Sequence, residues 1–162
     1  LRAGQQGHPF RLYKFRTLPP DSPAVVTPSD PTRMGRLLRR WALDELPQLW
    51  NVLRGEMSLV GPRPILPEEA SHYTPRQQQR LSVPPGLTGW AQIHGRNALP
   101  WHKRIEYDLW YVRHQSLWID LRILLSTPGA LLKGDGVYGP GNHDPNADDL
   151  AAHRLQSADS QG

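Results

Sequence analysis

Proline and glycine occur so often along this chain that most of it cannot form long helices or wide sheets. The 162 residues include 17 prolines and 14 glycines, and proline breaks an established helix because it lacks a backbone N–H. The proline-rich stretch from 19 to 31 is predicted to be a loop. A chain of this length forms one domain with a modest core. We therefore predict an α+β fold with mostly short helices and a small sheet.

The helix signals fall between these breaks. Thr32 can cap a helix that runs through Trp41. At 100° per residue this helix is amphipathic: Met34, Leu37, Leu38 and Trp41 share one face, and Arg33, Arg36, Arg39 and Arg40 share the other. Pro100 can open a third helix, and Ser116 can cap a fourth over the stretch LWIDLRILLSTPGALL.

A second helix is predicted around Pro47, which is tolerated only in a first helical turn. Its position places the adjacent acids Asp44 and Glu45 at or just before the helix N-terminus. Gly55 is predicted to end this helix. On the helix the residues Leu46, Leu49, Trp50 and Leu53 are expected to face the core, with Asp44, Gln48 and Asn51 on the opposite side.

The remaining segments are shorter. Residues 10–18 and 57–60 are predicted strands, the second of which leads into the rigid corner Gly-Pro-Arg-Pro at 61–64. Residues 66–82 are predicted to be a polar helix broken at Pro75, and 83–97 a turn, a short strand and a further turn. From Gly139 onward the sequence is rich in Gly, Asp, Asn and Ser, and we expect a disordered tail after a domain spanning 1–138.

Composition excludes several classes of site. The chain has no cysteine, which rules out disulfides, thiolate metal sites and a cysteine nucleophile. The net charge of +4 suits nucleic acid, a phosphorylated substrate or an anionic membrane surface. The cations are dispersed and no nucleic-acid-binding motif occurs, so we predict no nucleic-acid partner. There is no run of about 20 apolar residues that would suit a membrane-spanning helix.

The Asp44-Glu45 pair has two interpretations. Acids at a helix N-terminus commonly serve only to cap the helix and complement its dipole. The same place also favours phosphate binding, where one carboxylate can attack phosphorus while its neighbour holds a divalent cation. Spacing alone leaves both interpretations open.

Three arginines and one further acid are candidates for the same chemistry. Arg39, Arg63 and Arg96 lie where a turn or a helix face could present them to phosphate oxygens, and fixed cations stabilise phosphoryl transfer. The alternative for these arginines is surface solubility. Asp120 lies among apolar neighbours on the fourth predicted helix, so it needs a cationic partner. That partner would form either a structural ion pair or a contact that orients a catalytic arginine.

Four motifs in unbroken order then carry a resemblance. They are YKFRTL (13–18), GRLLRRWALDELPQLWNVLRGEMSLVGPRP (35–64), PGLTGWAQIHGRN (85–97) and EYDLWYVRHQSLWIDLRIL (106–124). Together they resemble the bacterial sugar transferase family, the monotopic polyprenyl-phosphate phosphoglycosyl transferases. The similarity extends from about residue 4 to 138.

The resemblance implies a reaction and roles for the candidate residues. A UDP-sugar would give its sugar 1-phosphate to a polyprenyl phosphate such as undecaprenyl phosphate, with release of UMP, as the first membrane step of a surface glycan. Such glycans include exopolysaccharide, capsule, O-antigen and glycoprotein glycans. Asp44 would be the catalytic nucleophile that forms a covalent phosphosugar, and Glu45 would hold Mg²⁺ and could also act catalytically in proton transfer. Arg39, Arg63, Arg96 and Asp120 fall on the family's substrate-binding positions.

Family members also carry a hydrophobic re-entrant helix before the KFR segment, and we find none in this chain. We expect a catalytic domain at the cytoplasmic face of a bacterial inner membrane, with amphipathic helices at the membrane surface. These would be the helix at 33–40 and the region of Trp110, Trp118 and Leu124. The alternative is a catalytically incompetent fragment that only binds nucleotide-sugar or membrane.

Overall fold

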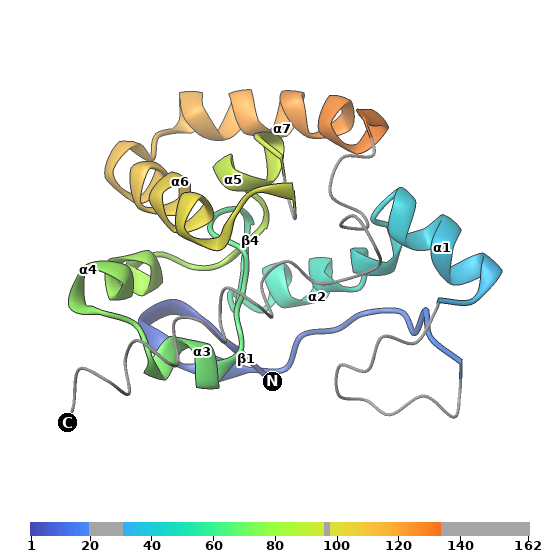
Figure 1. Ribbon diagram of the computed structural model, residues 1–162, viewed down its shortest axis with the longest axis horizontal. Helices are drawn as coiled ribbons and strands as arrows, with labels where there is room; N and C mark the ends of the chain where they lie inside the picture. Colours follow the sequence, from blue (N-terminus) through green and yellow to red (C-terminus); the bar gives the residue numbers. More distant parts are fainter. Residues whose placement is uncertain (20–30, 96–97, 134–162) are drawn as a thin grey trace.

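The computed structural model describes residues 1–19, 31–95 and 98–133 (Figure 1). The predicted tail from 139 to 162, Arg96 and most of the proline-rich loop lie outside the described residues. In the part that is described, short helices dominate and the strands form two small pairs. This confirms the predicted α+β fold of mostly short helices with little sheet.

The elements follow one another closely. In chain order they are β1 (Arg2–Ala3), the 3-10 helix η1 (Gln5–Gly7), β2 (Pro9–Phe10), α1 (Arg33–Arg40), the 3-10 helix η2 (Leu43–Glu45), α2 (Gln48–Leu53), β3 (Ser58–Val60), α3 (Pro67–Ser71), α4 (Pro75–Gln78), the 3-10 helix η3 (Gln79–Ser82), β4 (Gly86–Thr88), α5 (Trp90–Ile93), α6 (Trp101–His114) and α7 (Leu117–Lys133). The strand predicted at 57–60, the break at Pro75 and the helices at 101–114 and 117–133 are confirmed.

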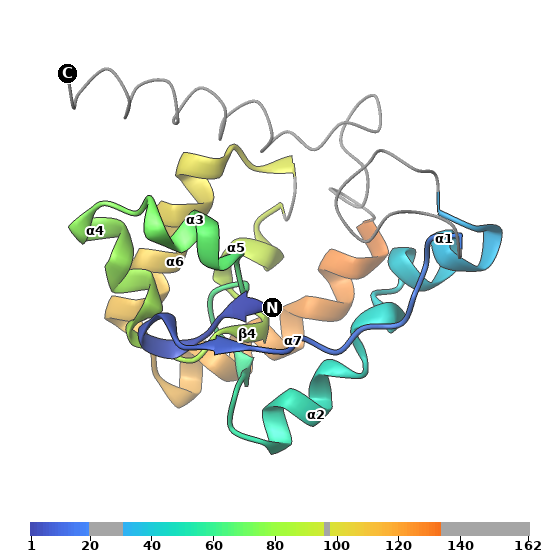
Figure 2. The same cartoon turned by 90° about the horizontal axis from the view of Figure 1, so that it is seen from below.

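Figure 1 shows α7 lying across the top of the molecule above α5 and α6, with α2 and the N-terminal segment below. Figure 2, turned by 90°, again shows the C-terminal end of α7 beside α1. Two clusters of buried side chains hold the layers together. The first joins Ala3, Ile65, Tyr73, Ile105 and Leu109, and the second joins Val60, Tyr111 and Ile123. The core therefore sits around α6 and the strand β3.

The parallel pair β3 and β4 brings two distant segments into backbone contact. Ser58 lies opposite Gly86, and Val60 lies opposite Thr88. A Cβ atom at Gly86 would collide with the backbone of Gly61. Glycine is therefore required at Gly86 for close approach of the two chains. This contact fixes the start of the corner that follows β3.

Capping residues set the helix ends as predicted. The Thr32 hydroxyl accepts a hydrogen bond from the Gly35 N–H at 2.9 Å, which begins α1. Gly55 adopts a φ of 74° directly after α2, a conformation that glycine reaches without strain. Ser116 accepts from the N–H of Ile119 at 3.4 Å at the start of α7.

The predicted strand at 10–18 is largely wrong. Only Pro9–Phe10 pairs as β2, and the following residues run extended beside η2 and α2. The reason lies in their partners: the Tyr13 N–H donates to the side-chain oxygen of Asn51, and the Phe15 N–H donates to the backbone oxygen of Asp44. A side chain and a 3-10 turn take the place of a neighbouring strand.

The predicted orientation of α2 is also wrong. Leu46, Leu49, Trp50 and Leu53 are exposed, with Leu53 79% accessible. The buried side instead carries Gln48 and Asn51. Asn51 is fully buried because its amide binds the extended segment, donating to Arg11 O and accepting from the Tyr13 N–H. Polar side chains are inside here because they satisfy main-chain groups that have no strand partner.

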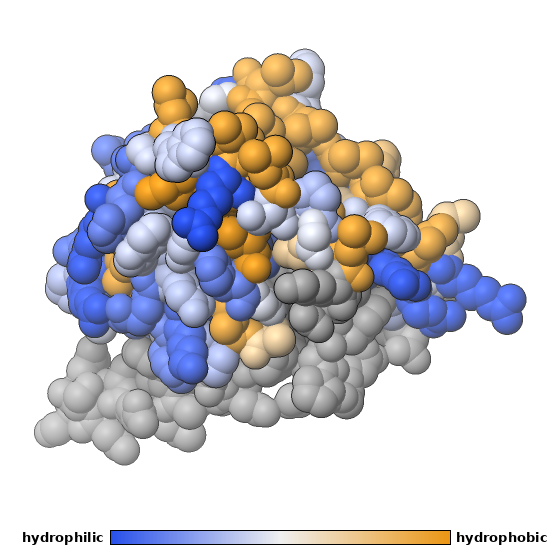
Figure 3. Space-filling model, turned by 90° about the horizontal axis from the view of Figure 1, so that it is seen from above, coloured by the Kyte–Doolittle hydropathy of each residue, from blue (hydrophilic) through white to orange (hydrophobic). Residues whose placement is uncertain are grey.

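Large apolar side chains are exposed on α7 as well. Leu117, Trp118 and Leu125 are 89%, 77% and 73% accessible. Figure 3 shows hydrophobic atoms gathered in a band across the face seen from above. No helix within the described ranges is both long and apolar enough to cross a bilayer.

Candidate active site

The Gly-Pro-Arg-Pro corner is fixed by hydrogen bonds to two of its backbone carbonyls and to that of Ile65, which follows it. The carbonyl of Pro62 accepts from the Gly86 N–H at 2.8 Å, and that of Ile65 accepts from the Ala3 N–H at 2.8 Å. Between them the Arg63 carbonyl accepts from the Arg80 guanidinium at 2.8 Å. The Arg63 side chain therefore projects from a backbone that is held on both sides.

The two adjacent acids lie on η2, a 3-10 turn between α1 and α2. Ala42 adopts a φ of 53°, which turns the chain sharply from α1 into this element. Pro47 then precedes the first residue of α2, as its tolerance for the first turn predicts. Asp44 and Glu45 are therefore close to a helix N-terminus, although α2 itself begins only at Gln48.

Four side chains from three segments converge here. Nζ of Lys14 lies 2.9 Å from Oδ2 of Asp44 and 3.3 Å from Oε1 of Glu45. Arg63 grips the Glu45 carboxylate with both terminal nitrogens, at 2.8 Å and 3.4 Å. Asp44 is only 2% exposed, whereas the Arg63 side chain is 46% exposed. Fold and sequence together thus place a buried carboxylate beneath a group of cations that solvent can reach.

Lys14 is a site residue that the sequence prediction missed. Its two neighbours are both fixed, Tyr13 by Asn51 and Phe15 by the backbone of Asp44. In an extended segment alternate side chains point to opposite sides, so Lys14 points to the side opposite its two neighbours. The signal was present in the YKFRTL motif, where one lysine stands between two aromatic residues.

The charges stabilise one another. Burial of the Glu45 carboxylate by itself favours the neutral form, but Arg63 and then Lys14 outweigh it and lower the pKa of Glu45 to about 2. In return the negative charge of Glu45 raises the pKa of the Arg63 guanidinium. Both groups are thus ionised at neutral pH. The Asp44 Oδ2 atom is buried and has no hydrogen bond within the described chain, since the close Lys14 contact is an ion pair without hydrogen-bond geometry.

Two carboxylate oxygens meet at one cation in this arrangement, and that is the donor set on which a magnesium site can be built. Mg²⁺ is commonly held by one or two carboxylates together with substrate phosphates and water. The Lys14 ammonium occupies the point where Asp44 Oδ2 and Glu45 Oε1 converge. Among the residues that the structure describes, no group of three or more acidic, His or Cys side chains could hold a metal alone. The residues present fit an ion that is shared with a phosphorylated ligand.

Two of the predicted site residues, Arg39 and Asp120, bind partners outside this cluster. Arg39 donates from Nε to the hydroxyl of Thr17 at 2.8 Å, on the helix that leads into η2. Asp120 accepts a hydrogen bond from the Tyr111 hydroxyl at 2.7 Å. Among the residues that the structure describes, no cationic partner of Asp120 is found, and this tyrosine hydroxyl takes its place. Burial and then the contact with the Asp120 carboxylate raise the pKa of Tyr111. Arg96 lies outside the described residues.

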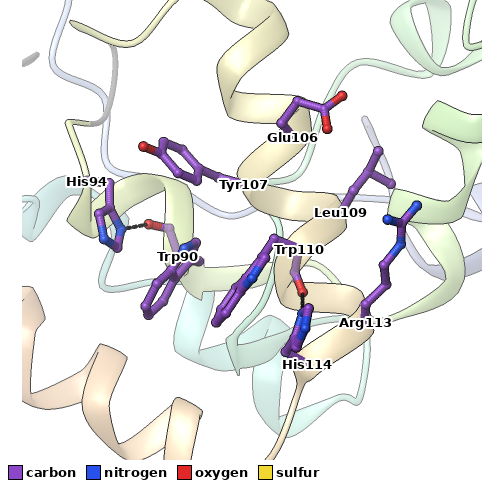
Figure 4. Close-up of a pocket in the computed structure, with 8 residues that line it drawn as sticks. All are labelled: Trp90, His94, Glu106, Tyr107, Leu109, Trp110, Arg113 and His114. Atoms are coloured by element: carbon purple, nitrogen blue, oxygen red, sulfur yellow. Dashed lines mark hydrogen bonds between the residues drawn. The ribbon is translucent and has the colours of Figure 1, made fainter.

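A shallow cavity of about 530 Å³ lies elsewhere, between α5 and α6 (Figure 4). Its lining includes Trp90 and Trp110, whose rings stack at 4.4 Å, and the histidines His94 and His114, whose rings lie against them. Each histidine donates its Nδ1–H to the carbonyl of the tryptophan four residues earlier, at 2.7 Å. The aromatic faces already pack on one another, and no predicted site residue among those that the structure describes lines this cavity. The acid and cation cluster on η2 is therefore the candidate active site.

An exposed arginine on a fixed corner, a lysine and two acids beside a helix start define a class of site suited to phosphate esters and diphosphates. Comparison with protein families matches residues 1–134 to the family described as bacterial sugar transferase. The chain belongs to the bacterial sugar transferase family.

Individual relatives agree. The chain is 49% identical over 141 residues to the uncharacterized sugar transferase EpsL of Bacillus subtilis (strain 168), covering 85% of this chain and 70% of that protein. It is 41% identical to the UDP-galactose-lipid carrier transferase of Erwinia amylovora and 45% identical to the UDP-glucose:undecaprenyl-phosphate glucose-1-phosphate transferase of Xanthomonas campestris pv. campestris. In both cases 85% of this chain aligns, but it spans only about a third of the relative, 33% and 31%.

Proposed function

We propose that this protein transfers a sugar 1-phosphate from a UDP-sugar to a polyprenyl phosphate such as undecaprenyl phosphate, with release of UMP. The observation that carries the proposal is the contact of the buried Asp44 and the partly buried Glu45 with the cations Lys14 and Arg63. The names of two relatives, which specify a UDP-galactose-lipid carrier and a UDP-glucose:undecaprenyl-phosphate reaction, support it.

The proposed reaction has two displacements at one phosphorus atom. A carboxylate oxygen of Asp44 attacks the phosphorus that carries the sugar, and the bond to the oxygen bridging the two phosphates breaks, so UMP leaves. A phosphate oxygen of the polyprenyl phosphate then attacks the same phosphorus. The aspartyl oxygen leaves as a free carboxylate, and a polyprenyl diphosphate sugar is formed.

Each cation of the site has a defined role in this reaction. Arg63 binds Glu45 with both terminal nitrogens and its side chain is 46% exposed, so it can transfer this two-nitrogen contact from Glu45 to a phosphate. Lys14 must leave Oδ2 of Asp44 before that oxygen can attack, and a diphosphate offers it an alternative partner. Mg²⁺, held by Glu45 and the diphosphate oxygens, would neutralise charge as the leaving group departs.

Membrane contact is part of the proposal. Exposed apolar side chains occur on α2 and α7, and exposed arginines lie on α1. Apolar and tryptophan side chains that enter the headgroup region, flanked by cations, are typical of helices lying on an anionic bilayer. A lipid acceptor would reach the site from such a surface. We propose the cytoplasmic face of a bacterial inner membrane, where the step would begin synthesis of a surface glycan.

The direct test is UMP release from UDP-glucose or UDP-galactose with undecaprenyl phosphate in detergent and Mg²⁺. Asp44→Asn keeps the shape of the side chain but removes the nucleophile, so turnover should fall to background. Mass spectrometry of the wild-type protein given only a UDP-sugar should detect a hexose phosphate adduct on the peptide that contains Asp44. Undiminished turnover of Asp44→Asn would remove Asp44 as the nucleophile.

The second candidate is a domain that binds a nucleotide-sugar without turning it over. The buried position of Asp44 under Lys14 favours it, because this state does not present the carboxylate to a ligand. Calorimetric binding of a UDP-sugar without UMP formation, with lipid acceptor present, would support this candidate. Turnover would exclude it.

A further inference from the structure

A buried ion pair joins η3 to α6 outside the group of acids and cations described above. Nε of Arg80 lies 2.7 Å from Oδ2 of Asp108, and the two side chains are only 7% and 2% exposed. Burying two charges costs more free energy than the pair recovers unless the remaining donors and acceptors are also engaged. The other contacts of Arg80 therefore indicate what this pair supports.

Two further acceptors complete the surroundings of Arg80. Nη1 donates to the Tyr73 hydroxyl, and Nη2 donates to the backbone carbonyl of Arg63 at 2.8 Å. The guanidinium thus has a different partner on each nitrogen, from α6, from Tyr73 between α3 and α4, and from the Gly-Pro-Arg-Pro corner. Because the guanidinium is planar and rigid, fixing two of these partners fixes the third.

Only one of the partners belongs to the candidate active site. The carbonyls of Pro62 in the corner and of Ile65 directly after it are bound by backbone N–H groups, whereas the Arg63 carbonyl is bound by a side chain. The Arg63 guanidinium in turn grips Glu45 at 2.8 Å. A continuous series of contacts therefore runs from Asp108 through Arg80 and Arg63 to the acids on η2.

We infer that Arg80, anchored by Asp108, is a positioning residue that sets the place of Arg63 for phosphate binding. It touches no substrate. Its role is to hold the backbone from which Arg63 projects, so that the Arg63 side chain meets Glu45 and then the diphosphate at one fixed place. The role in the reaction rests on the proposed function, whereas the effect on Arg63 can be measured without it.

The chain offers a matched control close by, because α4 precedes η3 directly and both acids lie on α6. Arg76 lies four residues before Arg80 and pairs with Glu106 at 2.6 Å, two residues before Asp108. This second pair is exposed, 59% and 53%, and within the described residues neither side chain is bonded to Arg63. Arg80→Lys changes a buried pair that is in contact with the corner. Arg76→Lys makes the same chemical change in an exposed pair that is not.

The first measurement is the NMR spectrum of the full chain with ¹⁵N-labelled arginine. The Arg63 signals are assigned by their loss in Arg63→Lys. In the wild type the two-nitrogen grip on Glu45 should restrict rotation of the Arg63 guanidinium and give separate Nη proton signals. We expect Arg80→Lys to merge these signals and Arg76→Lys to leave them unchanged. Unchanged Arg63 signals in a folded Arg80→Lys protein would overturn the inference.

The second measurement is UMP release per folded molecule, with folding checked by circular dichroism. We expect Arg80→Lys to lose about tenfold or more, because a displacement of about 1 Å in a binding group can cost on the order of a hundredfold. Arg76→Lys should stay within about twofold. Full turnover in Arg80→Lys with merged Arg63 signals would overturn the role in the reaction.

Two further outcomes distinguish a failure of the proposed function from a failure of the inference about Arg80. If the wild type releases no UMP but Arg80→Lys still merges the Arg63 signals, the proposed function fails and the positioning of Arg63 stands. If Arg80→Lys does not fold, Asp108→Asn is measured in the same way, because it keeps the shape of the side chain and removes only the charge of the ion pair. The Arg63 signals should then merge in part, and no change would again overturn the inference.

Discussion

The ammonium nitrogen of Lys14 lies 2.9 Å from a carboxylate oxygen of Asp44, although 30 residues separate them along the chain. Neither residue could take this position alone. Lys14 is presented by an extended segment whose neighbouring N–H groups are bound by Asn51 and by the backbone of Asp44 itself. The acid thus helps to place the cation that covers it.

Lys14→Met should lower UMP release by at least about tenfold, because it removes a fixed cation from a site where negative charge develops. The control is Lys103→Met, which removes an exposed lysine from α6. Initial rates at saturating UDP-sugar measure the effect. Equal rates for the two variants would show that the Lys14 contact has no part in turnover.

The low pKa of Glu45 predicts a pH dependence of stability. Its pKa is about 2 in the folded protein against an ordinary 4.5, so folding favours the ionised form. The stabilisation is complete above about pH 4.5 and is lost as the pH falls towards 2. The free energy of unfolding of the wild type minus that of Glu45→Gln should therefore shrink over this interval. A difference that stays constant from pH 5 to pH 2 would contradict the ion pair with Arg63.

Two helical glycines should respond to alanine with opposite signs. A Cβ at Gly35 would collide with the backbone of Thr17, so Gly35→Ala should destabilise the fold by about 1–3 kcal/mol. Gly129 on α7 has nothing near the Cβ position, so Gly129→Ala should stabilise the fold by up to about 1 kcal/mol. Urea denaturation of both variants measures the difference. A loss in both would mean that α7 has a contact at Gly129.

The apolar surface of α7 predicts binding to vesicles. The double change Trp118→Gln and Leu125→Gln should weaken co-sedimentation with vesicles of phosphatidylcholine and phosphatidylglycerol, because both side chains are more than two-thirds exposed. Leu1→Gln is the control, since it removes a leucine that is 71% exposed at the opposite side of the molecule from α7 in Figure 1. Equal binding of all three proteins would exclude α7 as the contact surface.

The sequence was sufficient where a local rule determines structure. Thr32, Gly55, Pro75 and Pro100 set the element ends in the expected places. Each acts within one turn through capping, backbone freedom or the absence of an N–H. Such signals require no knowledge of what packs on the element.

The orientation of α2 could not be predicted in that way. An apolar stripe on a helix usually faces the core, and here Leu49, Trp50 and Leu53 face outward. Which side of the helix is buried depends on the extended segment at 11–15, whose main chain needs the Asn51 amide. That requirement is visible only once the two segments lie together.

The residues of the candidate site were likewise predicted in part. Asp44, Glu45 and Arg63 were identified as candidates and do converge. Lys14 and Arg80 were missed because each reaches its partners from a distant segment, and the pairing expected for Asp120 was replaced by a tyrosine hydroxyl. Partners that come from distant segments cannot be read from spacing along one helix.

The pairing of Ser58 with Gly86 and of Val60 with Thr88 links phosphate binding to folding of the segment between the two strands. Arg63 and Arg80 both lie within the stretch that this pairing closes. Each arginine has its final neighbours only in the folded state in which these two strands are paired. The ability to hold a diphosphate should therefore depend on this pairing, and a protease cut between the two strands should abolish it even while distant helices survive.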